Sequence, residues 1–248
     1  MSGHNKWSTI KHKKAATDAK RGKIYTRIVK EIILAAKAGG DPDINPRLRT
    51  AIGTAKQANM PRENVERAIK RGTGEIEGAA YEEITYEGYG QNGVGIVVDV
   101  MTDNKNRSVA DVRHAFSKYG GDMAVAGAVA WNFEHKGYFT VPAEGLEEDD
   151  IMMAALDAGA EDIQKSDEDY EIYTSPHDFH TVLSTLEKAG YKVENAELTR
   201  IPKTTINADN VAEKLLKLID QLEELDDVQK VYANFEFSDE VMARLNQE

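Results

Sequence analysis

The fold is encoded most clearly in residues 136–201, KGYFTVPAEGLEEDDIMMAALDAGAEDIQKSDEDYEIYTSPHDFHTVLSTLEKAGYKVENAELTRI. Apolar periodicity predicts two helices, 147–159 and 176–190, and four strands, at 137–141, 161–166, 170–175 and 191–201. Their order is strand–helix–strand–strand–helix–strand, which is the ferredoxin-like pattern. We therefore expect residues 135–204 to form a complete α+β lobe.

The segments before and after this lobe, residues 80–134 and 205–248, each contain part of the elements that one further α+β lobe requires. Residues 82–89, 94–102 and 128–134 have strand patterns, and residues 106–121 form a predicted helix with Ser108 as its N-cap. This set lacks a second helix. A helix from Asn207, as N-cap, to Leu225 and a strand at 228–237 would supply the missing parts. We therefore predict a second α+β lobe from residues 80–134 and 205–248, with the ferredoxin-like lobe inserted into it.

The first 74 residues are predicted to be helical. Apolar residues cover one side of a helix over 18–38, which Gly39-Gly40 and Asp41-Pro42 should end. A second helix begins with Asn45 as N-cap and Pro46 at its first position, and a third runs from Pro61 to Gly72. The overall expectation is an α+β protein of three domains, the first being a three-helix module over 1–74.

Charge is distributed very unevenly along the chain. The net charge is −12, but residues 1–74 contain 17 Lys and Arg against 6 Asp and Glu, a net charge of +11. The other 174 residues therefore carry −23. A basic segment of this kind suggests a polyanionic partner, whereas the acidic remainder should repel phosphate.

The basic run between residues 6 and 30 is the main candidate nucleic-acid-binding segment. Lysines and arginines can neutralise phosphates, and interleaved aromatic rings can stack on bases. The alternative is a solvated helix face, which is what most charged runs are. The candidate residues in this run are Lys6, Trp7, Lys11, Lys13, Lys14, Lys20, Arg21, Lys23, Arg27 and Lys30.

Lys105 and Arg107 suggest a second anion-binding position. They lie where a predicted strand leads into a helix, and exposed amides at a helix start attract anions. An ordinary polar connection explains the same residues equally well.

Other motifs favour structural interpretations. Residues 88–93 match a dinucleotide fingerprint, but a strand follows them instead of a helix, so they are predicted to form a hairpin turn. His177 and His180 have a spacing that could share a metal, but the sequence indicates no third ligand, and a structural or surface pair is favoured. The acids at 147–150 suit the first turn of a helix. No catalytic constellation is found, and we expect neither a catalytic site, a metal, a cofactor nor a small-molecule substrate.

Composition excludes several classes. With 41% hydrophobic and 30% charged residues, the chain resembles globular proteins, and the absence of cysteine excludes disulfides and thiolate metal sites. No apolar stretch is long enough to span a membrane, and residues 1–14 do not resemble a secretory signal. We therefore expect a cytoplasmic protein that does not bind membranes.

Several long motifs resemble the YebC family, also called the PmpR family. They include residues 3–32, NPRLRTAI at 45–52, NMPRENVERAIKRG at 59–72, YEGYGQNGVGIVVDV at 86–100 and TDNKNRSVADVRHAFSKYGG at 102–121. Asn5 and Trp131 are minor departures from the family pattern. The resemblance implies three domains, one helical and two α+β, and no enzymatic activity. Bacterial members are usually described as cytoplasmic DNA-binding transcriptional regulators, and mitochondrial relatives activate translation of cytochrome oxidase subunit I.

The sequence therefore predicts a non-enzymatic, nucleic-acid-binding regulator of gene expression, with DNA-binding transcriptional regulation as the first interpretation. The alternative is a ribosome-associated translation factor that binds ribosomal or transfer RNA. A protein that reads a specific DNA sequence usually directs a recognition helix at base edges, and no helix of the three-helix module over residues 1–74 can be given that role from sequence.

Overall fold

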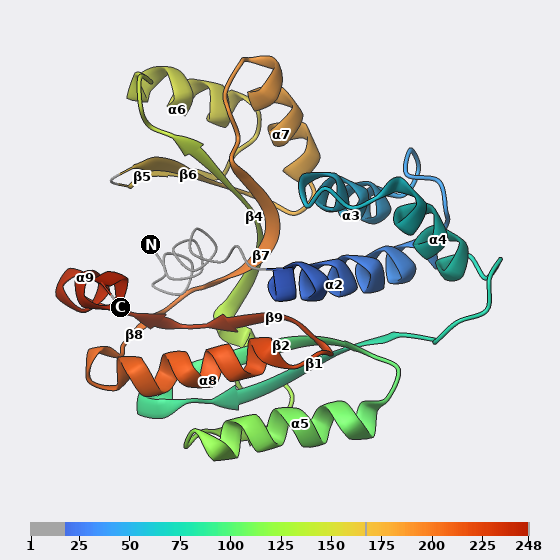
Figure 1. Ribbon diagram of the computed structural model, residues 1–248. Helices are drawn as coiled ribbons and strands as arrows, with labels where there is room; N and C mark the ends of the chain where they lie inside the picture. The colour runs from blue at the N-terminus through green and yellow to red at the C-terminus, as the bar shows by residue number, and fades with distance from the viewer. Residues whose placement is uncertain (1–17, 167, 248) are drawn as a thin grey trace. The chain divides into compact units, whose positions relative to one another are not determined.

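The computed structural model describes residues 18–166 and 168–247, with side chains from residue 22 to residue 245 apart from residue 167 (Figure 1). The chain divides into two compact units. Unit 1 comprises Met1–Ala130 and Thr205–Glu248, and unit 2 comprises Trp131–Thr204. Both contain helices and antiparallel sheet, which confirms the predicted α+β class. The finer division into three domains stays a prediction.

Unit 1 begins with three helices, α2 (Asp18–Ala36), α3 (Pro46–Gln57) and α4 (Arg62–Gly72). Their apolar sides share a core that includes Ile32, Leu48 and Ala68. As predicted, the Asn45 side chain caps α3 by accepting a hydrogen bond from the Leu48 amide at 3.1 Å. We call residues 18–74 the helical head.

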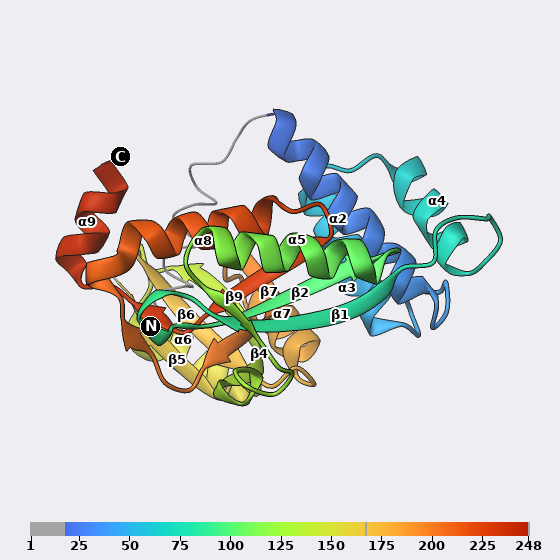
Figure 2. The same cartoon turned by 90° about the horizontal axis from the view of Figure 1, so that it is seen from below.

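The rest of unit 1 is built on a sheet of four strands in the order β3-β1-β2-β9. Two helices, α5 (Lys105–Lys118) and α8 (Ala212–Glu224), cover one face of this sheet, as Figure 2 shows, and their apolar residues fill its core. Strand β9 pairs antiparallel with β2, so the C-terminal segment does return to this sheet. The strands are β1 (Glu82–Tyr89), β2 (Gly95–Thr102), β3 (Asp122–Ala124) and β9 (Val228–Ala233).

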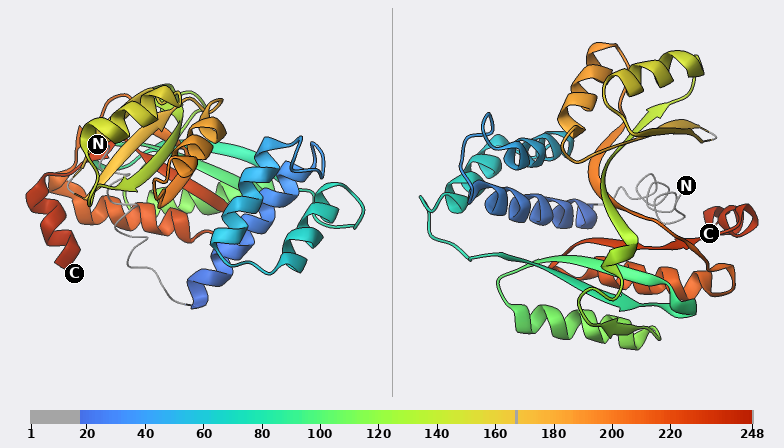
Figure 3. Two further views of the ribbon diagram at one scale, coloured as in Figure 1. Left: turned by 90° about the horizontal axis from the view of Figure 1, so that it is seen from above. Right: turned by 180° about the vertical axis from the view of Figure 1, so that it is seen from behind.

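Unit 2 has the predicted strand–helix–strand–strand–helix–strand order. Its sheet has the strand order β5-β6-β4-β7, and α6 and α7 pack on one face (Figure 3). Phe139, Ile172 and Phe179 are among the side chains buried between that face and the helices. The elements are β4 (Phe133–Pro142), α6 (Glu148–Asp157), β5 (Asp162–Lys165), β6 (Asp169–Thr174), α7 (Phe179–Lys188) and β7 (Asn195–Pro202).

The predicted strand at 128–134 is wrong for residues 128–132, and its last two residues belong to β4 of unit 2. This segment forms a loop and the short 3₁₀ helix η2 (Ala130–Asn132) before β4 begins at Phe133. The buried Glu87 carboxylate accepts hydrogen bonds from the amides of Gly127, Val129 and Ala130, at 2.6, 2.6 and 2.8 Å. These amides are therefore unavailable to a neighbouring strand.

Two predicted helix caps are also wrong. Asn104, not Ser108, caps α5 by accepting a hydrogen bond from the Arg107 amide, and the helix begins three residues earlier than Ser108. Asn207 ends the short strand β8 (Ile206–Asn207), and η3 (Asp209–Val211) precedes α8. The glycine-rich segment does form a turn, η1 (Gln91–Gly93), between β1 and β2. The structure adds β10 (Phe235–Glu236) and α9 (Asp239–Gln247), which were not predicted as separate elements.

Within the described residues, no helix is both long enough and apolar enough to cross a membrane.

Candidate nucleic-acid interface

The residues proposed from sequence fall into three groups. Lys6, Trp7, Lys11, Lys13 and Lys14 lie outside the described residues. Lys20 and Arg21 lie in the first turn of α2, where only the backbone is described. Lys23, Arg27, Lys30, Lys105 and Arg107 lie within unit 1 and their side chains can be followed.

Lys23, Arg27 and Lys30 form a stripe along α2 that contacts residues 223–227, which we call the acidic turn. This turn links the end of α8 to β9. The Lys23 ammonium lies 2.6 Å from the Glu224 carboxylate and also donates to the Glu224 carbonyl, while the Arg27 guanidinium donates to the carbonyl of Glu223. The three cations are spaced four and three residues apart, so they share one helix face.

The C-terminal end of α8 attracts these cations because its carbonyl groups and its helix dipole are negative there. The last carbonyl groups of a helix have no partners inside the helix, and its C-terminus carries a partial negative charge. Here donors from α2 satisfy two of those carbonyls, and the neighbouring acidic side chains add charge. Burial lowers the pKa of Arg27, whereas Glu223, Glu224 and Asp226 act in the opposite direction.

Asp227 is the most highly connected residue of this contact. One of its oxygens accepts from the Lys30 ammonium at 2.9 Å, and the other from Arg107 Nη2 at 2.7 Å. The hydroxyls of Thr102 and Ser108 each donate to it at 2.9 Å. Burial alone would raise the pKa of Asp227, but hydrogen bonds, led by those from Arg107 and Lys30, outweigh burial and lower the pKa to about 2.

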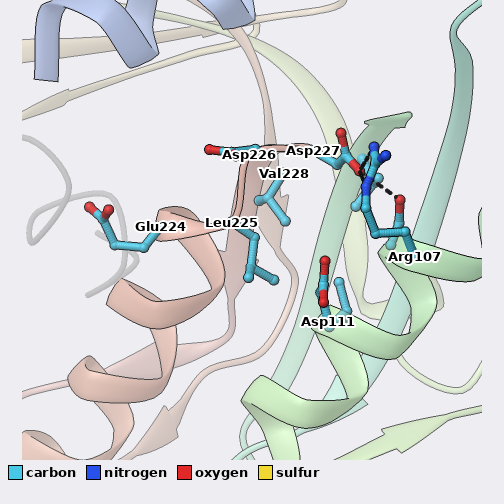
Figure 4. Close-up of a pocket in the computed structure, with 10 residues that line it drawn as sticks. Arg107, Asp111, Glu224, Leu225, Asp226, Asp227 and Val228 are labelled. Carbon is cyan, nitrogen blue, oxygen red and sulfur yellow. Dashed lines mark hydrogen bonds and ion pairs between the residues drawn. The ribbon is translucent and has the colours of Figure 1, made fainter. Parts of the chain in front are cut away.

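Both cations of the predicted anion-binding position, Lys105 and Arg107, are paired with carboxylates. Lys105 pairs with Glu82 at 2.6 Å, and Arg107 pairs with Asp103 as well as Asp227. A pocket of about 280 Å³ lies between α5 and the acidic turn; its wall includes Asp111, Glu224, Asp226 and Asp227 (Figure 4). Both cations are already balanced by acids, so the geometry does not favour phosphate at this position.

Four exposed cations of the helical head that were not predicted as site residues are also unpaired within the described residues. Lys56 lies near the end of α3, and Arg67, Lys70 and Arg71 lie on α4. Within the described part of the chain, none of these four side chains has a hydrogen bond or an ion pair. The spacing of Arg67, Lys70 and Arg71 in RENVERAIKRG, residues 62–72, is the sequence signal that indicates a basic helix face.

The helix-free face of the unit 2 sheet is acidic. Tyr173 lies opposite Tyr138 in the antiparallel pairing, and its hydroxyl donates to Glu171 at 2.8 Å. Burial raises the pKa of Glu171, although hydrogen bonds from Tyr173 and Tyr138 oppose this rise. Strand register places five acids and one lysine on this face, namely Glu134, Asp162, Asp169, Glu171, Glu197 and Lys136. Glu171 is buried and Glu134 pairs with Lys136 and Lys203, so only part of this acidic charge faces solvent.

From sequence, His177 and His180 are given a structural or surface interpretation. Among the described residues, no group of three or more histidines and acids could hold a metal ion. His180 makes an edge contact with Phe179, whose ring is buried in the unit 2 core.

Three helices and a four-stranded sheet in unit 1, with the α+β unit 2 inserted between Ala130 and Thr205, define a class of α+β proteins. Residues 5–75 match the family description TACO1/YebC protein N-terminal domain, and residues 81–235 match TACO1/YebC second and third domain. The chain belongs to the TACO1/YebC family.

Curated relatives match over almost the whole chain. A protein of Acidithiobacillus ferrooxidans is 59% identical over 99% of this chain and 98% of its own length, and one of Dictyoglomus turgidum is 55% identical over 99% and 100%. Both are named probable transcriptional regulatory protein. The crystal structure of a conserved hypothetical protein from Aquifex aeolicus has 48% identity and a TM-score of 0.80, covering 90% of this chain and 93% of that one. The names of the two curated relatives thus place a regulatory role at the level of the family.

Proposed function

We propose that this protein regulates transcription in the cytoplasm by binding DNA through its basic N-terminal part, without catalysing a reaction. The observation that carries the proposal is the set of exposed cations on the helical head that have no partner among the described residues. Residues 1–74, which include the helical head, have a net charge of +11. The acidic α+β remainder repels phosphate, so the head is the part of the chain suited to DNA. The names of the relatives support a role in transcription.

The acidic sheet face of unit 2 favours one alternative. A ribosome-associated factor would meet RNA with its basic head and could meet basic ribosomal proteins with an acidic surface. This alternative predicts binding to ribosomes and little preference among DNA sequences.

Selection of duplexes from a random-sequence library, followed by direct competition at physiological salt, separates the two functions. A transcriptional regulator should prefer its selected site over random duplex by about a thousandfold or more. Co-sedimentation of the whole protein with ribosomes is the parallel measurement. Ribosome binding together with no duplex preference would replace the transcriptional proposal by the translational one.

A further inference from the structure

The connection between α3 and α4 has the form of a helix-turn-helix. Four residues, 58–61, separate the two helices. Asn59 adopts the left-handed conformation at φ +55°, and the Met60 amide donates a hydrogen bond to the Ala55 carbonyl at 2.9 Å. Met60 is itself buried in the core of the head, and Pro61 precedes the first residue of α4. The hydrogen bond to Ala55 and the buried Met60 side chain therefore fix the turn, and the turn fixes the direction in which α4 leaves α3.

The inner face of α4 is fixed against α2. Ala68 is buried, and Val65 and Ile69 pack against the same core. Gly72 approaches α2 so closely that a Cβ atom there would lie 2.4 Å from the Ile33 carbonyl oxygen. Because these positions follow the i, i+3, i+4, i+7 spacing, the opposite face of α4 points away from the core.

That outer face carries Arg67, Lys70 and Arg71, all exposed and unpaired within the described structure. Figure 1 shows α4 at the edge of unit 1, with the end of α3 leading into it. Lys56 adds a fourth exposed cation just before the turn. Arg62 differs from these residues, because its guanidinium pairs with Glu66 at 2.7 Å.

The α2 stripe cannot serve in the same way while it holds the acidic turn. Lys23, Arg27 and Lys30 already donate to carboxylates and helix-terminal carbonyls. Phosphate contacts by these side chains would require breaking those bonds. The unpaired cations of α4 need no such rearrangement.

We propose that the outer face of α4, extended by Lys56, is the surface on which the phosphate backbone of duplex DNA lies. This inference rests on the proposed DNA binding and names its site. Phosphate contacts position a protein on the duplex without reading its sequence. Arg67, Lys70 and Arg71 therefore contribute affinity for any duplex.

The test compares the whole protein with the triple variant Arg67→Ala, Lys70→Ala, Arg71→Ala in fluorescence anisotropy on a random-sequence DNA duplex at several salt concentrations. Each phosphate contact contributes about 0.9 to the slope of log K against log salt, so loss of three contacts should flatten that slope by about 2.7. Affinity near 0.1 M salt should fall at least about tenfold.

A matched control removes the same charge elsewhere. Lys188, Lys214 and Lys217 on α7 and α8 are exposed and have no partner among the residues that the structure describes, so their triple alanine variant should keep the wild-type slope. The charge-preserving variant R67K/K70R/R71K should also keep it. Circular dichroism must show a folded α4 variant, because cations near a helix C-terminus also stabilise the helix.

Failure of the α4 site and failure of the proposed DNA-binding function give different results in this test. If the wild-type protein binds DNA and the α4 variant keeps the full slope, the α4 site is wrong while DNA binding stands. If the control variant flattens the slope equally, only net charge is involved and the site is again wrong. If the wild-type protein binds no DNA duplex but binds an RNA duplex of the same length, both the proposed function and the DNA site are overturned.

Discussion

The Lys30 ammonium of α2 lies 2.9 Å from the Asp227 carboxylate, which immediately precedes β9, and their side chains are only 8% and 10% exposed. Lys30 also donates to the carbonyls of Met101 and Asp226, at 3.2 and 2.8 Å. A lysine that would be assigned to the solvent face of an isolated helix is thereby buried between the head and the sheet of unit 1. The pair ties residues separated by 197 positions in sequence.

Replacing Asp227 should strongly destabilise the protein. Asp227→Ala leaves the buried Lys30 ammonium without its counter-ion, which should lower the free energy of unfolding by about 3–5 kcal/mol. Lys30→Met should cost less, because Asp227 keeps Arg107, Thr102 and Ser108. Urea denaturation measures both variants. The control is Asp111→Ala at an exposed position, whose free energy of unfolding should stay within about 0.5 kcal/mol of wild type. A larger loss of stability for Lys30→Met than for Asp227→Ala would contradict the proposed role of Asp227 as the counter-ion of Lys30.

The same carboxylate should make stability depend on acid pH. The pKa of Asp227 is lowered to about 2 in the folded protein, so its contribution is fully present above the unfolded-state pKa near 4. It is then lost as the pH falls through the folded-state value near 2, a change of about 2.5 kcal/mol. Denaturation of wild type and Asp227→Asn from pH 6 to pH 2 should therefore show a converging difference. A difference that stays constant over this range would show that Asp227 is not the titrating group.

Gly72→Ala should disturb the contact between α4 and α2. The added methyl group would lie 2.4 Å from the Ile33 carbonyl oxygen and 2.6 Å from the Ala36 side chain, so a helix must move. We expect a loss of about 1–3 kcal/mol in thermal or urea unfolding. Gly53→Ala in α3 meets no atom within 4 Å and should stabilise the helix by up to about 1 kcal/mol. Equal effects at the two positions would refute the close packing of α4.

Lys23→Ala combined with Arg27→Ala should leave the salt dependence of DNA binding almost unchanged. Both cations bind the acidic turn in the folded protein, so they release few counter-ions when DNA binds. The slope of log K against log salt should change by less than about 1. A decrease near 1.8, the value for two lost phosphate contacts, would mean that DNA displaces the acidic turn.

The lysines nearest the N-terminus carry a separate expectation from sequence. The sequence predicts phosphate contacts by Lys11, Lys13, Lys14, Lys20 and Lys23, but Lys23 is bound to the acidic turn. Alanine at the other four should flatten the same slope by about 3.6, because four phosphate contacts would be lost. The affinity should fall on all duplex sequences alike. Thermal unfolding should stay near wild type. An unchanged slope would remove these lysines from the interface, and a large fall in melting temperature would assign them to the fold.

Local patterns predicted most elements because they depend on neighbouring residues. The cap at Asn45, the glycine-rich turn before β2 and the order of elements in unit 2 all follow from short-range preferences. The predicted strand at 128–134 does not begin at 128 because the carboxylate of Glu87, some 40 residues away, accepts hydrogen bonds from the amides of Gly127, Val129 and Ala130. The prediction of Ser108 as the N-cap of α5 is wrong because Asn104 caps this helix and the Ser108 hydroxyl donates to Asp227.

The sequence by itself determined the class of the fold, the basic character of the first 74 residues and the acidic character of the rest, because periodicity and charge are properties of the chain. Only the tertiary structure decided which cations remain available. Lys23, Arg27 and Lys30 lie on one side of α2, but whether that side meets water or the acidic turn depends on how α8 and β9 pack. Arg67, Lys70 and Arg71 stay exposed because Ala68 and Gly72 turn the opposite face of α4 towards α2. Long-range packing leaves no local signal in sequence, since its partners are far apart along the chain.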